Sequence, residues 1–169
     1  MQRIGVSAIL LVALSVAARA ADLPDSRITP GALLPATANQ VCTPGYARTR
    51  RHVTAAVRRQ VFASYGLDGN HTGYCAGRQG CEIDHLVSLE LGGSNDPANL
   101  WPESYDSQPW NAHRKDRLEN ALHRLVCSGR LGLGEAQRAI STDWIAAYGR
   151  YVGQPVAALV RAPRRPAPR

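Results

Sequence analysis

An adjacent acid and histidine, followed by an asparagine and a second histidine, give the middle of the chain the residue types of a hydrolytic site. Asp84 and His85 lie near the start of the run EIDHLVSLELGGSNDPANLWPE at 82–103, and Asn99 lies near its end. His113 follows in the segment NAHRKD. A neutral imidazole can take a proton from water near neutral pH, which is typically worth ~10²–10⁴-fold in rate. A divalent cation held by a carboxylate and an imidazole would neutralise charge that develops on a phosphodiester under attack.

Two short strands and a helix are expected to position these residues. The segment EIDHLVSLEL alternates apolar and polar residues like a strand, and GGSNDPAN has the composition of a turn. NLW is a second short strand, which Pro102 ends. The segment NAHRKDRLENALHRLVCSG predicts an amphipathic helix that stops at Gly129. Other helices are expected at about 54–65 and, as two short pieces, in GEAQRAI and TDWIAAYGRYV, so the predicted fold class is α+β.

Strand geometry sets a condition on the Asp84–His85 pair. Adjacent residues on a regular strand point to opposite faces of the sheet. Both side chains can therefore face one cavity only where the strand ends or bulges.

Over roughly residues 80–127 the chain resembles the HNH nucleases. The resemblance is carried by an acid-histidine pair, two glycines, an asparagine and a helix histidine: Asp84, His85, Gly92, Gly93, Asn99 and His113. It implies a small ββα-metal core of two short strands and a helix, which the additional helices would flank. It also implies an endonuclease that hydrolyses phosphodiester bonds in nucleic acid, with DNA favoured and RNA as the alternative. Nothing in the sequence suggests a specificity module, so low sequence specificity is expected.

The same resemblance implies a role for each residue. His85 matches the general base, and Asn99 matches the residue that braces the loop holding that base. Asp84 and His113 match the ligands of one divalent cation, for which Mg²⁺ or Mn²⁺ is expected, with Zn²⁺ or Ni²⁺ as alternatives. Because the gap from Asn99 to His113 is long, Asn111 is a second candidate for the helix ligand. The cysteine pairs that bind a structural zinc in many family members are missing here.

Two neighbouring polar residues have simpler interpretations. Glu82 lies two residues before Asp84 and is expected to support the site without acting as a ligand. His123 falls beside the apolar face of the predicted helix, which favours a structural role.

Basic residues outnumber acidic residues by 20 to 13, which gives a net charge of +7. Of the basic residues, 19 are arginine and only one is lysine. The planar fork of arginine suits phosphate, so this composition permits a polyanionic partner without proving one. Five arginines cluster at 48–59, where a solvated helix face is the alternative to a nucleic-acid surface. The residues expected to contact nucleic acid are Arg58, Arg59, Arg114 and Lys115.

Composition divides the chain into four parts. Residues 1–20 combine a short positive start, an apolar run and the sequence ARA, which is typical of a cleaved signal peptide. Residues 21–45 form a proline-rich extended lead-in, and 46–155 form the nuclease-like domain. Residues 156–169 are a basic, proline-rich tail that is expected to be disordered. A periplasmic or secreted monomer is expected, without membrane contact after cleavage.

All four cysteines follow the predicted signal peptide, as expected for two disulfides formed in an oxidising compartment. Cys75 and Cys81 are separated by five residues, which is wider than the spacing of zinc clusters. Of the three possible connectivities we predict Cys75–Cys81 and Cys42–Cys127.

A non-catalytic secreted binding module on the same HNH-like scaffold is the alternative function. Such a module would keep the predicted strands and helix but degrade no nucleic acid. Metal-dependent loss of supercoiled plasmid separates the two functions.

Overall fold

The computed structural model describes residues 22–67, 75 and 79–153. The predicted signal peptide, the predicted tail and most of the glycine-rich loop before Cys81 lie outside this part. Within it the fold is α+β, as predicted, and no helix is long and apolar enough to cross a bilayer. The elements are α1 (Ala38–Val41), α2 (Tyr46–Arg50), α3 (Ala55–Ser64), β1 (Cys81–His85), η1 (Leu89–Leu91), η2 (Pro97–Asn99), β2 (Leu100–Ser104), α4 (Ala112–Cys127) and α5 (Leu133–Tyr151).

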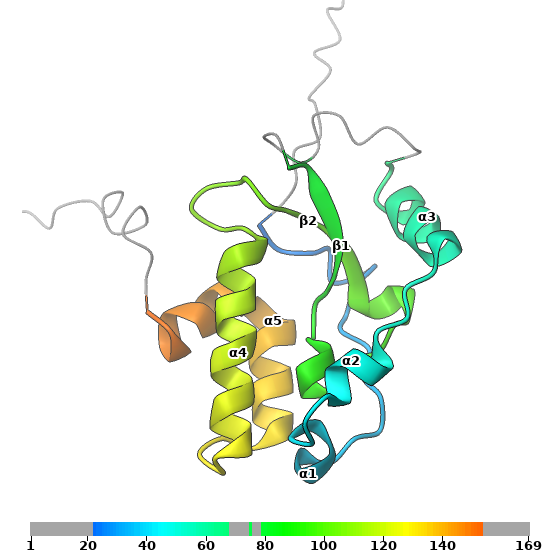
Figure 1. Cartoon of the computed structure of the whole chain (residues 1–169). Coiled ribbons are helices and arrows are strands. Elements are labelled where there is room, and N and C mark those ends of the chain that lie inside the picture. The colour runs from blue at the N-terminus through cyan, green and yellow to red at the C-terminus, as the bar shows by residue number, and fades with distance from the viewer. Residues whose placement is uncertain (1–21, 68–74, 76–78, 154–169) are drawn as a thin grey trace, which may run out of the picture.

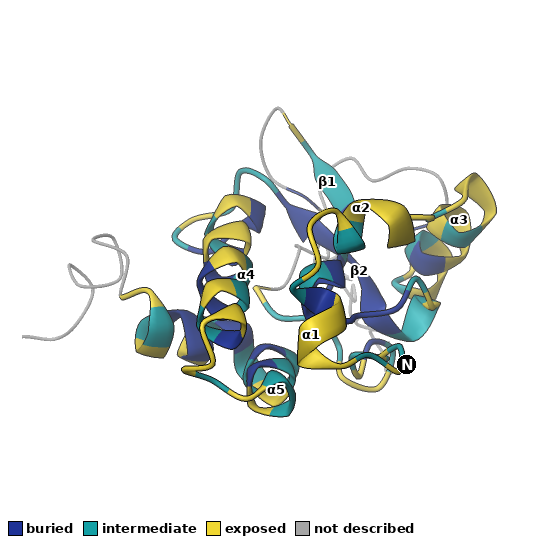
Figure 2. Cartoon of the chain, turned by 60° about the horizontal axis from the view of Figure 1, so that its bottom comes forward, coloured by how far each residue is buried: buried dark blue, intermediate teal, exposed yellow. Residues whose placement is uncertain are grey.

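The two strands form an antiparallel sheet that lies between two groups of helices (Figure 1). Its register pairs Asp84 with Trp101 and His85 with Leu100. Ile83 and Leu100 form a small buried cluster that packs against α3. Trp101 belongs instead to the main core, which includes buried residues of α4 and α5. The sheet therefore buries both faces, and β2 is buried along its whole length (Figure 2).

β1 ends at His85, although the sequence predicted a strand that continues to residue 91. The chain turns instead into η1, where the Ser88 side chain accepts a hydrogen bond from the Glu90 N–H. Gly92 ends this turn with φ = 81°, a left-handed conformation that suits glycine. The following residues 86–89 are all buried, so apolar character alone could not mark where the strand stops.

α4 and α5 pack against each other beside the sheet (Figure 1). The predicted amphipathic helix is confirmed as α4, which buries Leu118, Leu122 and Val126. The two short helices expected after it form one element, α5, with a kink at Asp143. At the kink the Asp143 carboxylate accepts a hydrogen bond from the Ala146 N–H, which caps the second part of the helix.

The proline-rich lead-in before residue 45 packs against the main core, and its last part forms the short helix α1. Leu33 forms a β-bridge with Gly93, and the Thr29 hydroxyl donates to the Leu100 carbonyl at 2.9 Å. The Trp144 indole N–H donates to the Asp22 carbonyl. This segment thereby ties α5 to the second strand.

Both predicted disulfides are confirmed. Cys42–Cys127 joins the end of α1 to the end of α4, with a Cα–Cα distance of 5.5 Å. Cys75–Cys81 joins the loop to the first residue of β1, with a Cα–Cα distance of 5.3 Å.

The two disulfides should differ in their effect on stability because they close loops of different length. Their sequence separations are 85 and 6 residues. Replacing the Cys42–Cys127 pair by serines should lower the free energy of unfolding by about 4 kcal/mol, and replacing Cys75–Cys81 by about 2 kcal/mol, in the chain-entropy model. Urea denaturation of both variants measures the difference. An equal loss in the two variants would contradict the prediction.

Candidate functional site

Asn99 holds the loop between β1 and β2 in place. Its side-chain oxygen accepts a hydrogen bond from the Val87 N–H at 2.9 Å, and its amide donates to the Val87 and Ser94 carbonyls at 3.0 and 2.9 Å. Asn99 is fully buried. A side chain at Gly93 would place its Cβ 1.8 Å from the Val87 carbonyl oxygen and 2.8 Å from the Asn99 amide. Gly93 and Asn99 of the motif are thus both required because the backbone at Gly93 lies close to Val87.

His85 is buried at the end of β1, where the Asn99-braced loop begins. Its Nε2 lies 3.0 Å from the side-chain oxygen of Asn95. The Asn95 amide in turn donates to the Arg50 carbonyl at 2.7 Å, and its oxygen accepts from the His52 N–H at 3.3 Å. Burial disfavours the imidazolium and lowers the pKa of His85 below its usual value. The imidazole is therefore neutral at neutral pH, as a general base must be.

Asp84 faces a buried lysine on α4. The Lys115 ammonium donates to the Asp84 carboxylate at 2.5 Å, to the His85 carbonyl at 2.6 Å and to the Glu119 carboxylate. The Lys115 side chain has no exposed surface. Its three donors match these three acceptors, so the ammonium is fully satisfied although it is buried.

Two further acids lie beside Asp84. Glu82 and Glu103 are directly paired across β1 and β2, and oxygens of Glu82, Asp84 and Glu103 all lie within 4.8 Å of one another. The Tyr105 hydroxyl donates to Glu82 at 2.7 Å. Glu103 is 2% exposed, no N–H or hydroxyl group donates to its carboxyl oxygens, and the Asp84 carboxyl lies beside it.

The acids around Lys115 differ in their affinity for protons. Burial opposes ionisation of Asp84, but the attraction and hydrogen bond of Lys115 help to hold its pKa below the usual value. Burial raises the pKa of Glu103 well above its usual value and raises the pKa of Glu119 to about 7. The neighbouring carboxylates raise the pKa of Lys115 against the effect of its own burial. The stable charge pair is therefore Asp84 with Lys115.

Asp84 and His85 contact different sides of the sheet. Both remain paired with β2, so strand alternation directs their side chains to opposite faces. Their contacts agree, because Asp84 meets Lys115 of α4 whereas His85 meets Asn95, which binds the end of α2. β1 does end at His85, as the sequence required if both side chains were to face one cavity. The two side chains nevertheless lie on opposite faces of the strand end and do not line the same cavity.

The two candidates for the helix ligand lie at the start of α4. His113 is exposed, and its ring centroid lies 5.5 Å from that of Tyr105. Within the described residues, His113 belongs to no group of three ligand atoms with Asp84. Asn111 caps α4: its oxygen accepts from the Arg114 N–H and its amide donates to the Ser107 carbonyl. Its polar atoms are thus used in the fold.

The residues expected to contact nucleic acid fall into two groups. Arg58 and Arg59 are exposed on α3, on the side of the sheet where His85 contacts Asn95. Arg114 is half-buried, with one guanidinium nitrogen 3.2 Å from the Tyr148 hydroxyl. The expected phosphate contact of Lys115 does not fit, because its ammonium is buried and already bound to three acceptors. The prediction assumed that Lys115 is exposed, because lysine side chains are almost never fully buried unless they are paired.

The sequence interpretation missed Asn95, Glu103 and Glu119. Asn95 lies in a turn, where asparagine is common for backbone reasons, so nothing singled it out. Glu103 follows Pro102, which was expected to end the second strand; that prediction was wrong, because β2 continues through Pro102 to Ser104. Glu119 lies four residues after Lys115, a helical spacing that predicts a side-chain pair and could have been used.

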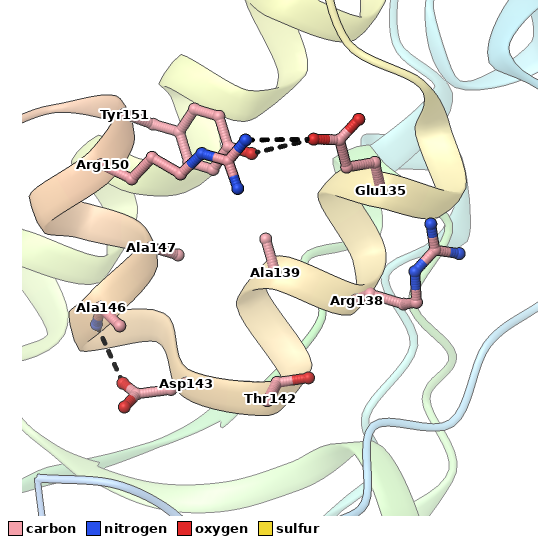
Figure 3. A pocket seen from close by; sticks show the side chains of 9 residues that line it. All are labelled: Glu135, Arg138, Ala139, Thr142, Asp143, Ala146, Ala147, Arg150 and Tyr151. Atoms are coloured by element: carbon pink, nitrogen blue, oxygen red, sulfur yellow. Dashed lines mark hydrogen bonds and ion pairs between the residues drawn. The ribbon is translucent and has the colours of Figure 1, made fainter.

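An open hollow of about 340 Å³ lies elsewhere, at the kink of α5 (Figure 3). Within it Arg150 and Tyr151 both bind Glu135, and Asp143 binds the Ala146 N–H. Arg150 and Tyr151 point to Glu135, whereas Asp143 points to the main chain of its own turn, and none of the residues at the end of β1 lines the hollow. We therefore place the candidate site at the end of β1.

Comparison of the chain with protein-family models, with curated proteins and with solved structures gave no match.

Replacing Asn99 tests the bracing of the loop. Asn99→Ala leaves buried backbone groups of Val87 and Ser94 without partners, each at a cost of about 1–3 kcal/mol. The free energy of unfolding should fall by about 2–4 kcal/mol, measured by urea denaturation. Asn120→Ala is the control, because Asn120 is exposed and should change stability by less than about 0.5 kcal/mol. Equal stability of the two variants would argue against bracing by Asn99.

Replacing Lys115 tests the buried charge pair. Lys115→Met leaves Asp84 uncompensated and should lower the free energy of unfolding by about 3–5 kcal/mol. Adding Asp84→Asn should recover part of this loss, because the unpaired charge is then removed. Arg117→Met, at an exposed position of the same helix, is the control and should have little effect. Strictly additive losses in the double variant would show that the two side chains are not coupled.

Proposed function

We propose that the chain is an exported, metal-dependent endonuclease of the HNH type that hydrolyses phosphodiester bonds in DNA with low sequence specificity. Two antiparallel strands followed in sequence by a helix, with His85 at the strand end and Asn99 bracing the loop, support this proposal. The order of these elements is the one that the resemblance implies.

The observation that carries the proposal is the link from His85 to the arginine-rich segment. Asn95 joins the His85 imidazole to the backbone of Arg50 and His52 through three hydrogen bonds. Arg48, Arg50, Arg51, Arg58 and Arg59 are all exposed along α2, the connection after it and α3. A neutral base is thus held next to a segment with five exposed arginines, where a phosphate backbone would bind without choice of sequence.

In this proposal His85 accepts a proton from water at Nδ1, because its Nε2 donates a hydrogen bond to the Asn95 side-chain oxygen. Asn95 fixes the ring orientation, and Asn99 fixes the loop that carries it. The arginines bind phosphates on either side of the bond that is cut. A divalent cation held by the acids on the α4 side of the sheet, Asp84 among them, would stabilise the charge on the phosphate and on the leaving oxygen.

The alternative, a non-catalytic binding module, has one observation in its favour. Lys115 already compensates Asp84, so this carboxylate does not need a metal ion to be stable in the fold. A binding module would keep the arginine surface and bind nucleic acid without cutting it.

Plasmid nicking tests the proposed function. The parent protein should convert supercoiled plasmid to the nicked form in Mg²⁺ or Mn²⁺ and lose this activity in EDTA. His85→Ala should lower the rate by about 10²–10⁴-fold, the usual contribution of a general base. His123→Ala is the matched control, because His123 lies in the second half of α4, away from His85, and contacts the Val41 carbonyl of α1. Undiminished nicking by His85→Ala would overturn its role, and DNA binding without any nicking would favour the binding module.

A further inference from the structure

We propose that Glu82, Asp84 and Glu103 form the binding site of one hard divalent cation. Register places Glu82 and Glu103 opposite each other on β1 and β2, and Asp84 follows Glu82 by two residues on the same face. Oxygens of the three carboxylates lie within 4.8 Å of one another. Three side chains of rigid, paired strands thus converge on one point.

The second observation is the state of Glu103. Glu103 is 2% exposed, and no N–H or hydroxyl group donates to either of its carboxyl oxygens. The polar group beside it is another acid, the Asp84 carboxyl. A buried polar group without a partner is costly, by about 1–3 kcal/mol or more for a charged group. Its oxygens lie among those of Glu82 and Asp84, so a cation bound there would supply the missing partner.

Neighbouring donors already orient the other two ligands. The Tyr105 hydroxyl binds one oxygen of Glu82, and the Lys115 ammonium binds one oxygen of Asp84. Such outer hydrogen bonds fix the direction of metal ligands and raise affinity. The positive charge of Lys115 also reduces the repulsion among the acids while the site holds no cation.

The ligand chemistry favours Mg²⁺, Mn²⁺ or Ca²⁺. All three donors are carboxylates, which suit hard cations, whereas Zn²⁺ and Ni²⁺ prefer sites that include imidazole or thiolate. The other group of candidate ligand atoms among the described residues joins His123 to Cys42 and Cys127, whose sulfurs form a disulfide. Those sulfurs are therefore not available as thiolates.

This ligand set replaces the one expected from the sequence. It keeps Asp84, adds Glu82 and Glu103, and leaves out His113, which is exposed against Tyr105. The inference rests on the proposed function for the role of the cation in hydrolysis. Binding of the cation can nevertheless be measured without nucleic acid.

Mn²⁺ titration, followed by calorimetry and by the electron paramagnetic resonance signal of free Mn²⁺, tests the site. The parent protein should bind one Mn²⁺. Glu103→Gln and Glu82→Gln keep the side-chain shape and should each raise the Kd for Mn²⁺ at least about 10-fold. Replacing a residue that only hydrogen-bonds to a metal ligand already lowers metal affinity by about 10-fold or more, so replacing a ligand should cost at least as much. Glu135→Gln, the same change at an exposed position of α5, is the matched control and should keep the Kd within about 2-fold. His113→Ala separates this ligand set from the one expected from the sequence and should also leave the Kd unchanged.

The possible outcomes separate this inference from the proposed function. Absence of Mn²⁺ binding at millimolar concentration, or unchanged binding in both glutamine variants, would overturn the cation site. So would a loss of binding in His113→Ala. Circular dichroism verifies that each variant is folded; if Glu103→Gln does not fold, Glu82→Gln decides. A protein that binds Mn²⁺ as described but nicks no plasmid would refute the nuclease and support the cation site.

Discussion

The ammonium of Lys115 is the point at which the sheet and α4 are joined. It binds the Asp84 side chain and the His85 carbonyl on β1, and the Glu119 carboxylate one turn along its own helix. A charge without exposed surface is tolerated only when its hydrogen bonds are complete and opposite charge is close. The requirement fixes the angle and depth at which α4 approaches the strand, since a shift of either element would leave a buried donor unpaired. The packing of α4 against α5 then follows from the apolar face of α4.

A second constraint acts on the other side of the same strand end. Asn99 ties the loop to Val87, Gly93 leaves room for the close approach, and Asn95 connects the loop to α2. The backbone at His85 is therefore held from the α4 side through its carbonyl, while its ring is held from the α2 side. Side chains restrained from two directions keep one orientation, which a general base needs in order to meet a water molecule at a fixed position.

The sequence predicted what depends on local pattern and spacing. The amphipathic α4, the helix at 55–64, the two short strands and both disulfides follow from periodicity, turn residues and cysteine spacing. The end of β1 could not be predicted, because residues 87–91 continue the alternation of apolar and polar residues although the chain there forms η1. Lys115 and Glu103 were misjudged for a related reason: charged residues are almost always exposed, and only the tertiary contacts show that these two are buried.

The separation of His85 from the acids limits how a substrate could use both. The ring of His85 and the carboxylates of Glu82 and Asp84 belong to opposite faces of β1, so no flat surface includes them all. At the end of the strand His85 follows Asp84 directly in sequence, and Lys115 binds the Asp84 carboxylate and the main-chain carbonyl of His85, not its ring. A nucleic-acid backbone that bound the arginines of α2 and α3 would have to cross this strand end to bring a phosphate near the acids.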